Sequence, residues 1–260
     1  MKNACTHDIE RVCSVPVHCW PHENVLEEMG RNIIGPREPR YISITNTESM
    51  YHARRIPAHR EYIEKARFSL CDGIGVVIGG WMEGKRVLRF NGPNLMLKSC
   101  QYGVAQGWRH FFCGGREGVA ELLSNNLTRQ FPGMITAGFY SPPFRNLTEE
   151  EETNMIQRIK DARPDIVWVG LGLLKQEAWI AKYIARIGAP WFIGVGAAFD
   201  YHAGTARWAP MWVRRIGMEW FYRLCHEPRM FKRNVFSFLF LLESANSAIR
   251  TRLRHPLRGK

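Results

Sequence analysis

Residues 166–195 read IVWVGLGLLKQEAWIAKYIARIGAPWFIGV, and this stretch decides the fold. Ile166–Val169 is a short β-branched and apolar run, and it is followed by the glycine turn Gly170-Leu171-Gly172. A helix is predicted over Gln176–Ile187, and Trp191–Val195 has the composition of another strand. The order strand, glycine turn, helix and strand is typical of a parallel sheet with helices on its faces.

The same order of elements occurs upstream and extends the pattern over most of the chain. Tyr41–Thr45, His110–Cys113 and Met134–Phe139 have strand composition, and a helix is predicted from about Glu117 to Arg129. Thr148-Glu149-Glu150-Glu151 is a capping box that starts a further helix. We therefore predict an α/β fold with a Rossmann-like parallel sheet flanked by helices.

The alternation divides the chain into three predicted parts. Residues 39–204 form the α/β catalytic domain, and residues 1–38 form an irregular N-terminal arm. Residues 205–260 form a basic amphipathic helical appendage, because the alternation stops and the remaining sequence is helical and basic. Within the appendage, apolar residues recur at the spacing of one helix and predict an apolar stripe. They are Trp212, Ile216, Trp220, Phe221 and Leu224.

Most of the excess charge lies in this appendage. The formal net charge of the chain is +12, and residues 204–260 contain twelve Lys or Arg against three Glu. Arginines interleaved with aromatic residues suit an anionic membrane surface or, alternatively, nucleic acid. The apolar run Val235–Leu242 is far shorter than the roughly 20 residues that cross a bilayer. No signal peptide is evident, so we expect a cytoplasmic protein that is peripheral on the inner face of the membrane.

The cysteines and acidic residues provide no metal-binding pattern. The seven cysteines are scattered and form no C-x-x-C pair, which is typical of reduced thiols. The Cys and His residues between Cys5 and His22 match no zinc template, and the chain has no Asp-x-Asp motif for a metal-bridged sugar nucleotide. We therefore expect no metal and no cofactor, with arginines neutralising a substrate diphosphate.

Two aspartates could act as a base. Asp72 follows the apolar residues Phe68 and Leu70 and is predicted to come after a helical stretch. Burial there would raise its pKa towards that of a useful general base. The alternative is a turn aspartate that caps a helix, and the same alternative applies to Asp200 after the sequence GVGAAF.

Three glycine turns could bind phosphate through backbone N–H groups, or could simply connect strands to helices. They are Gly114-Gly115, Gly170-Leu171-Gly172 and Gly194-Val195-Gly196. None completes the G-x-G-x-x-G pattern, which argues against a nucleotide-dependent oxidoreductase. Ligands in parallel α/β folds bind beyond the carboxyl ends of the strands. That rule brings together Asn46, Gly114, Gly172, Gln176 and Asp200 at one edge.

An ordered set of motifs from about Tyr41 to Arg233 resembles the bacterial TagA/CpsF/WecG-type glycosyltransferases, glycosyltransferase family 26. The most specific motif is Glu-Trp-x-x-Arg-Leu followed by Glu-Pro-Arg, because this is not a generic pattern. The full set is ITNTES, CDGIG, RFNGPNL, CGGREGVA, GLGLLKQE, GVGAAFDYHAG, ARWAP and GMEWFYRLCHEPRMFKR.

The resemblance implies an inverting, metal-independent transferase of cell-envelope polysaccharide or exopolysaccharide biosynthesis. The implied partners are a UDP-sugar donor, a polyprenyl-diphosphate-linked saccharide acceptor and the anionic inner-membrane surface, with no nucleic acid. The donor stays open between UDP-N-acetylmannosamine, its uronic acid and UDP-glucose, and a homo-oligomer is also left open. The alternative function is a basic nucleic-acid-binding protein that uses the Arg/aromatic tail.

The resemblance also implies roles for individual residues. Asp72 matches the proposed catalytic base, Asn46 matches the polar strand-end position, and Arg89 and Gln176 match pocket positions. Three arginines lie in the segment that reaches over the pocket, namely Arg223, Arg229 and Arg233. We further expect substrate contacts from Thr45, Gly114, Gly172, Glu177, Asp200 and Arg207.

The chain departs from the family pattern at three positions. Leu174 stands where Pro is common before Lys-Gln-Glu, Ile44 where Thr is common, and Asn94 where Asp is common. Because these positions lie near the expected sugar pocket, they leave the identity of the donor sugar open.

Overall fold

A computed structural model describes residues 9–227 and 231–254. The chain forms two compact units, each built from segments that are distant in sequence. Among the described residues, the first unit contains residues 9–20, 45–91, 208–227 and 231–254. The second unit contains residues 21–44 and 92–207.

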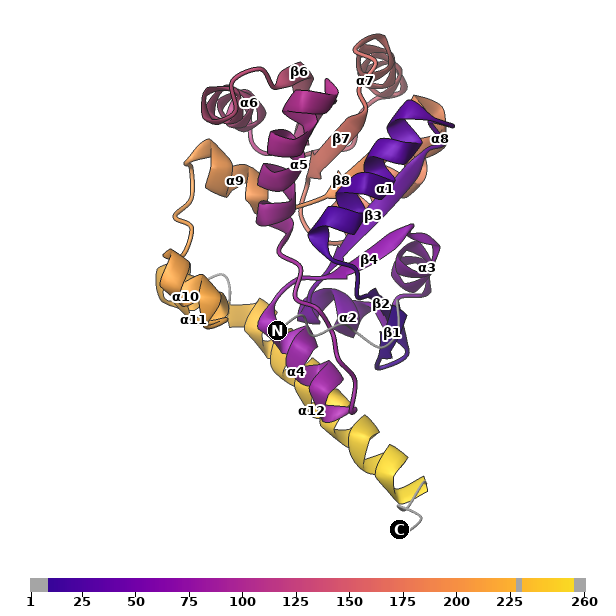
Figure 1. The fold of residues 1–260 in the computed structure, drawn as a ribbon, viewed down its shortest axis with the longest axis vertical. Coiled ribbons are helices and arrows are strands. Elements are labelled where there is room, and N and C mark those ends of the chain that lie inside the picture. The colour runs from indigo at the N-terminus through magenta and orange to yellow at the C-terminus, as the bar shows by residue number, and fades with distance from the viewer. Residues whose placement is uncertain (1–8, 228–230, 255–260) are drawn as a thin grey trace. The chain divides into compact units, whose positions relative to one another are not determined.

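The second unit is built on a parallel sheet, as the sequence predicts (Figure 1). The strands pair in the order β3-β8-β7-β5-β6, and all four pairings are parallel. Apolar side chains of the central strand β7 are fully buried, from Ile166 to Val169, which explains its continuous apolar run. The strands are β3 Arg40–Thr45, β5 Arg109–Gly114, β6 Ile135–Tyr140, β7 Ile166–Gly170 and β8 Trp191–Gly194.

Helices flank this sheet, and in Figure 1 α1 and α5 cross one of its faces. The predicted capping box of α7 is confirmed: Thr148 Oγ1 accepts from the Glu151 N–H at 3.2 Å, and the Glu151 carboxylate accepts from the Thr148 N–H at 2.9 Å. The helices are α1 His22–Ile34, α5 Gly92–Gln106, α6 Val119–Gln130, α7 Glu149–Asp161, α8 Lys175–Ile187 and α9 Ala198–Ala203.

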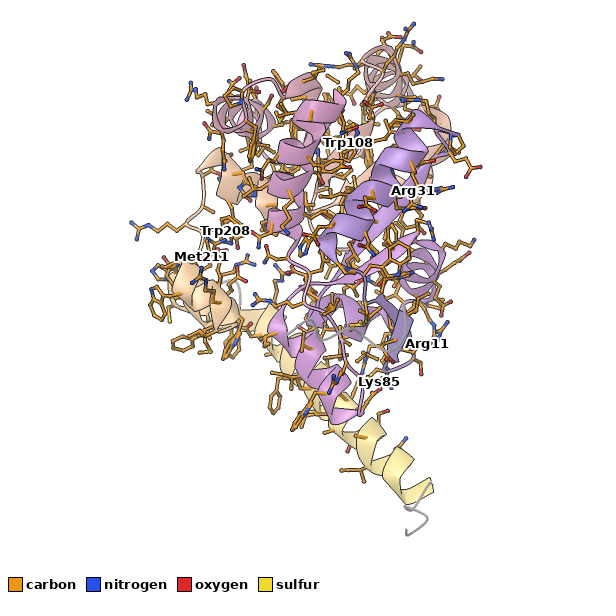
Figure 2. The ribbon with its side chains drawn as sticks, in the orientation of Figure 1. Arg11, Arg31, Lys85, Trp108, Trp208 and Met211 are labelled. Carbon is orange, nitrogen blue, oxygen red and sulfur yellow. The ribbon has the colours of Figure 1, made fainter. Side chains whose placement is uncertain are left out.

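The first unit starts with an antiparallel hairpin, β1 Ile9–Val12 and β2 Val15–His18. Cys13 and Ser14 form its turn with φ values of 47° and 68°, a conformation that suits two-residue hairpins. The Cys13 N–H donates to Glu83 Oε1 at 3.1 Å, and Lys85 donates to the Arg11 carbonyl oxygen (Figure 2). The prediction of an irregular arm over residues 1–38 is therefore wrong for its described part, which forms this hairpin and α1.

Strand β4, Phe68–Cys71, pairs in parallel with β2 and is buried along its whole length. Asp72 thus follows a strand, and the prediction that it follows a helical stretch is wrong. The helix α3 ends at Lys65, and the short run FSLC forms its own strand because all four side chains are covered. The helices of this part are α2 Thr47–Ala53, α3 Pro57–Lys65 and α4 Ile74–Met82.

The C-terminal residues complete the first unit with α10 Met211–Arg215, α11 Glu219–His226 and α12 Phe231–Arg254. The single amphipathic helix predicted after Met211 is wrong, because Gly217 adopts a φ of 78° and separates α10 from α11. Figure 1 shows α12 running alongside α4. Gly79 allows their close approach, since a Cβ there would lie 2.8 Å from the ring of Phe240.

Ion pairs fasten α12 to α2 and the residues that follow it. Glu243 accepts from Arg54 at 2.6 Å and also from Arg55. Arg233 pairs with Glu48 of α2, and the hydroxyls of Thr47 and Ser237 lie 2.6 Å apart. The residues of the predicted appendage therefore form one compact unit with residues 45–91. Within the described part of the chain, no helix is both long and apolar enough to cross a bilayer.

Candidate active site

Asp72 occupies the turn between β4 and α4 in the first unit. Its backbone N–H donates to the Thr45 carbonyl oxygen at 2.9 Å, which fixes the end of the strand. Gly73 follows with a φ of 89°, a conformation that favours glycine, and leads into Ile74 at the start of α4. The Asp72 side chain is only partly exposed. It is therefore held at a strand end, where side chains can reach a ligand.

Four charged side chains influence the Asp72 carboxylate. Burial raises its pKa to about 6, and the negative charge of Glu219 acts in the same direction. Arg89, Arg223 and Arg233 oppose this shift because their positive charges favour the carboxylate. The result is a carboxylate that is ionised at neutral pH and still basic enough to accept a proton in a reaction.

Arg89 is the arginine whose contacts are best defined. It donates from Nη1 to the Arg214 carbonyl oxygen at 2.7 Å and from Nη2 to Glu219 Oε2 at 2.6 Å. Its Nε is buried and has no hydrogen-bond partner among the described residues. A buried donor without a partner costs free energy, so this N–H group is suited to a ligand acceptor.

The other predicted arginines divide between described and undescribed positions. Arg223 lies on α11 with its Nε 3.6 Å from Glu227, and Arg233 lies on α12 beside Glu48. Arg229 lies outside the described residues. Arg207 is exposed at the end of the second unit. The structure thus brings Arg223 and Arg233 to Asp72, together with Arg89.

Asn46 and Thr45 hold the strand end in place. Asn46 is the N-cap of α2, and its side-chain oxygen accepts from the Ser49 N–H at 2.9 Å. The Thr45 side chain is fully buried, with its hydroxyl 2.9 Å from that of Ser69. Both residues position the backbone that hydrogen bonds to Asp72, and their contact with a substrate stays a prediction.

The second unit gathers the predicted glycine-turn residues at the carboxyl ends of its strands. Gly114 pairs with Gly170 across β5 and β7, and a Cβ on Gly114 would lie 2.6 Å from the Gly170 backbone. Gly172 follows β7 with a φ of 85°. The two strands therefore end side by side, and glycine is required there for a close backbone approach.

Gln176 fills the adjacent glycine turn. Its Oε1 accepts from the Gly196 N–H at 3.0 Å, and its Nε2 donates to Glu177 Oε1 at 3.1 Å. Gln176 and Glu177 are both buried. Asp200 Oδ1 accepts from the Thr205 hydroxyl at 3.0 Å, as expected of a capping aspartate. The geometry gives Gln176 and Asp200 structural roles, and their substrate contacts stay predictions.

Sequence reasoning missed Glu219 and Trp208. Glu219 accepts from Arg89 and, through Oε1, from Trp208 Nε1 at 3.1 Å. The signal was present, because Glu219 opens the most specific motif, Glu-Trp-x-x-Arg-Leu. Within the described residues, no group of three or more His, Cys, Asp or Glu side chains could hold a metal ion. The expected metal independence stays a prediction.

An α/β fold with a raised-pKa carboxylate facing three arginines defines a class: an enzyme that can activate a nucleophile next to a phosphorylated substrate. The comparison with known families agrees with this class and makes it specific. The model of the glycosyl transferase WecG/TagA/CpsF family matches residues 10–254, and the chain belongs to this family. It is a glycosyltransferase, as the resemblance implied.

Curated relatives extend this result. The chain is 27% identical over 84% of its length to a protein of Bacillus subtilis, of which it covers 85%. It is 30% identical to a protein of Bacillus spizizenii over 74% of each chain, and 27% identical to one of Staphylococcus aureus over 70% of each. All three are named N-acetylglucosaminyldiphosphoundecaprenol N-acetyl-beta-D-mannosaminyltransferase.

Proposed function

We propose that the chain transfers a sugar from a UDP-sugar to a polyprenyl-diphosphate-linked saccharide, with inversion and without a metal. The observation that supports this most strongly is the Asp72 site. A carboxylate with a pKa of about 6 lies in one unit with Arg89, Arg223 and Arg233. Such a transfer needs a base for the acceptor hydroxyl and positive charges for the diphosphate, and these residues could provide both.

The proposed reaction assigns a role to each. The Asp72 carboxylate accepts the proton of the acceptor hydroxyl while that oxygen forms a bond to the anomeric carbon of the donor. The bond between the anomeric carbon and the UDP oxygen breaks, and UDP leaves with the electron pair from the opposite face. Arg223 and Arg233 stabilise the negative charge that develops on the diphosphate. The free Nε donor of Arg89 can contribute to the same stabilisation.

The donor is proposed from the relatives. Their printed name describes transfer of N-acetylmannosamine to N-acetylglucosaminyldiphosphoundecaprenol, so UDP-N-acetylmannosamine is the first donor to examine. The departures from the family pattern at Ile44, Asn94 and Leu174 keep the uronic acid and UDP-glucose as alternatives. Leu174 adopts a φ of 67° at the N-cap of α8, so its backbone conformation also differs from one that proline could adopt.

The experiment is a transfer assay with these three UDP-sugars and a short-chain lipid diphosphate that carries N-acetylglucosamine. We expect one donor to give product at equal rates in magnesium and in EDTA. Absence of transfer from every donor would contradict the proposed function. Loss of activity in EDTA that manganese restores would contradict metal independence.

We also propose that the C-terminal helices bind the inner membrane surface. Ten apolar side chains on or next to α10, α11 and α12 are between 42% and 68% exposed, and exposed apolar side chains that gather on one surface can mark a membrane-interaction site. Basic residues such as Arg214 and Arg215 lie on the same helices, and each basic residue near an anionic leaflet contributes about 1 kcal/mol. The exposed residues are Met211, Trp212, Ile216, Trp220, Phe221, Phe231, Val235, Phe238, Leu242 and Ile249.

Point substitutions test this better than truncation, because α12 also packs on α2 and α4 inside the first unit. The double variant Trp212→Ser/Phe221→Ser should lose binding to phosphatidylglycerol vesicles in a flotation assay. The matched control is Phe144→Ser, which removes an apolar side chain that is 84% exposed in the second unit. Equal vesicle binding by both variants would contradict the proposal, and binding of duplex DNA instead would favour the nucleic-acid alternative.

A further inference from the structure

Glu219 and three residues around it form a closed set of contacts. Arg89 donates to the Glu219 carboxylate at 2.6 Å and to the Arg214 carbonyl oxygen at 2.7 Å. Trp208 donates from its indole nitrogen to the other Glu219 oxygen at 3.1 Å. The Arg214 guanidinium lies 3.6 Å from the centre of the Trp208 ring, a cation–π contact. Figure 2 places Trp208 just before Met211 at the start of α10.

This cluster joins two parts of the first unit that are remote in sequence. Arg89 precedes α5, whereas Glu219 is the first residue of α11. The Arg89 and Glu219 side chains are only 23% and 18% exposed, so their ion pair is stronger than a surface pair. Both Glu219 oxygens accept a hydrogen bond, and the two donors come from different segments of the chain.

A second contact seats the same segment on the Asp72 turn. Gly217 separates α10 from α11, and a Cβ there would lie 2.9 Å from the Cβ of Ile74. Ile74 is the first residue of α4 and lies two positions after Asp72. The backbone before Glu219 is thus packed against the Ile74 side chain, and a shift of α11 would be transmitted to the turn that carries Asp72.

The charged groups that face Asp72 come from three elements. Arg89 comes from the segment before α5, Glu219 and Arg223 from α11, and Arg233 from α12. Of these, Glu219 is the single acidic group, and it is bonded directly to Arg89. Glu219 therefore acts on Asp72 in two ways, through its own charge and through the position of Arg89.

We propose that Glu219 is a positioning residue for the sugar transfer: it holds Arg89 beside Asp72 and seats the α10–α11 turn on the Asp72 turn. This inference rests on the proposed role of Asp72 as the base. Glu219 does not touch the reacting atoms. Its carboxylate is required because two donors, from Arg89 and Trp208, converge on it, and an amide group would turn one of its own donors towards one of them.

The test compares Glu219→Gln with Glu219→Asp and with the control Glu243→Gln. Glu243 also holds two cationic partners in the first unit, Arg54 and Arg55, and neither is one of the three arginines that act most strongly on Asp72. Two quantities are measured: kcat/KM as a function of pH, and the titration midpoint of the Asp72 carboxyl by ¹³C NMR, assigned with Asp72→Asn.

Glu219→Gln should lower kcat/KM at pH 7.5 by about 10-fold, because Arg89 loses its acceptor. It should also move the acid limb of the profile and the NMR midpoint to lower pH by about 0.5 unit or more, because a negative charge near Asp72 is removed. In Glu219→Asp, the NMR midpoint of Asp72 should return most of the way to the wild-type value. Glu243→Gln should match the wild type in both quantities.

Wild-type kcat/KM and midpoint in Glu219→Gln, or the same changes in Glu243→Gln, would overturn the inference. If Glu219→Gln does not fold, Trp208→Phe is the substitute test of the positioning role. This variant removes one donor to Glu219 and keeps all charges. We then expect a loss of about threefold in kcat/KM at an unchanged midpoint, and an unchanged kcat/KM would overturn the inference. Absence of transfer by the wild type would contradict the proposed function, whereas the NMR midpoints would still report the coupling of Glu219 to Asp72.

Discussion

The two units treat their polar residues differently. In the second unit, the glycine turns and Gln176 satisfy one another: Gln176 bonds to Gly196 and Glu177, and Gly114 packs on Gly170. In the first unit, burial raises the pKa of the Asp72 carboxyl to about 6, and four charged side chains act on it. A site that performs chemistry has to keep such groups at a cost in stability. This contrast supports the proposal that the first unit provides the base, while the turns of the second unit provide a frame.

The largest expected effect comes from Asp72→Asn, which keeps the shape of the side chain and removes the base. We expect kcat to fall at least about 100-fold, in the range typical of a general base, while the affinity for UDP is retained. Transfer is followed with the donor that the panel identifies, and UDP binding is followed by calorimetry. Turnover at the wild-type rate would return Asp72 to a purely structural role and remove the contrast between the units.

The same substitution should stabilise the fold at neutral pH. The folded-state pKa of Asp72, about 6, lies above the ordinary value of 3.8 for an aspartate, so the ionised form is the costly one in the folded protein. The cost is absent below about pH 4 and complete above about pH 6. Asp72→Asn should therefore raise the free energy of unfolding at pH 7.5 by up to about 3 kcal/mol.

Urea unfolding of both proteins at pH 4 and pH 7.5 measures this difference. The two proteins should be closely similar at pH 4, because the wild-type side chain is then largely protonated in the folded state. A destabilised Asp72→Asn at pH 7.5 would mean that the arginines around Asp72 hold it in an ordinary ion pair.

A smaller effect is expected from a substitution in the second unit. Gln176→Leu leaves the Gly196 N–H without its side-chain acceptor and should lower the free energy of unfolding by about 1 kcal/mol. The control is Gln157→Leu, where an exposed amide on α7 donates to Asp161, and a change within about 0.5 kcal/mol is expected. A large loss of donor affinity in Gln176→Leu without loss of stability would show that Gln176 also contacts the substrate.

Local patterns in the sequence predicted the strands and helices of the second unit well. The strands around Ile166 and Trp191 are continuous apolar runs because both faces of the sheet are covered, and the Thr148 capping box needs only neighbouring residues. Such elements depend on short-range chemistry, so their position can be predicted from the chain alone.

The first unit was harder to predict because its decisive contacts are long-range. The Cys13-Ser14 turn lacks the Asn-Gly signal of a hairpin, and the FSLC strand is too short to show a period. The pair between Arg89 and Glu219 joins positions 130 residues apart. Asp72 was a candidate base from its apolar surroundings and from the family resemblance. Glu219 opens the most specific motif of that resemblance, but its contact with Arg89 could not be predicted without the fold.

The discontinuous composition of the first unit has a consequence for the order in which the protein is made. Once residue 207 has been synthesised, every described segment of the second unit exists, whereas the first unit still lacks α10, α11 and α12. At about 5–20 residues per second, residues 208–254 take roughly 2–9 seconds to follow. Until residue 219 is added, the nascent chain contains Asp72 and Arg89 but neither Glu219 nor Arg233. On the proposed mechanism, such an unfinished chain has the base and Arg89 but lacks the other three charged groups that act on Asp72, so we expect it to transfer no sugar.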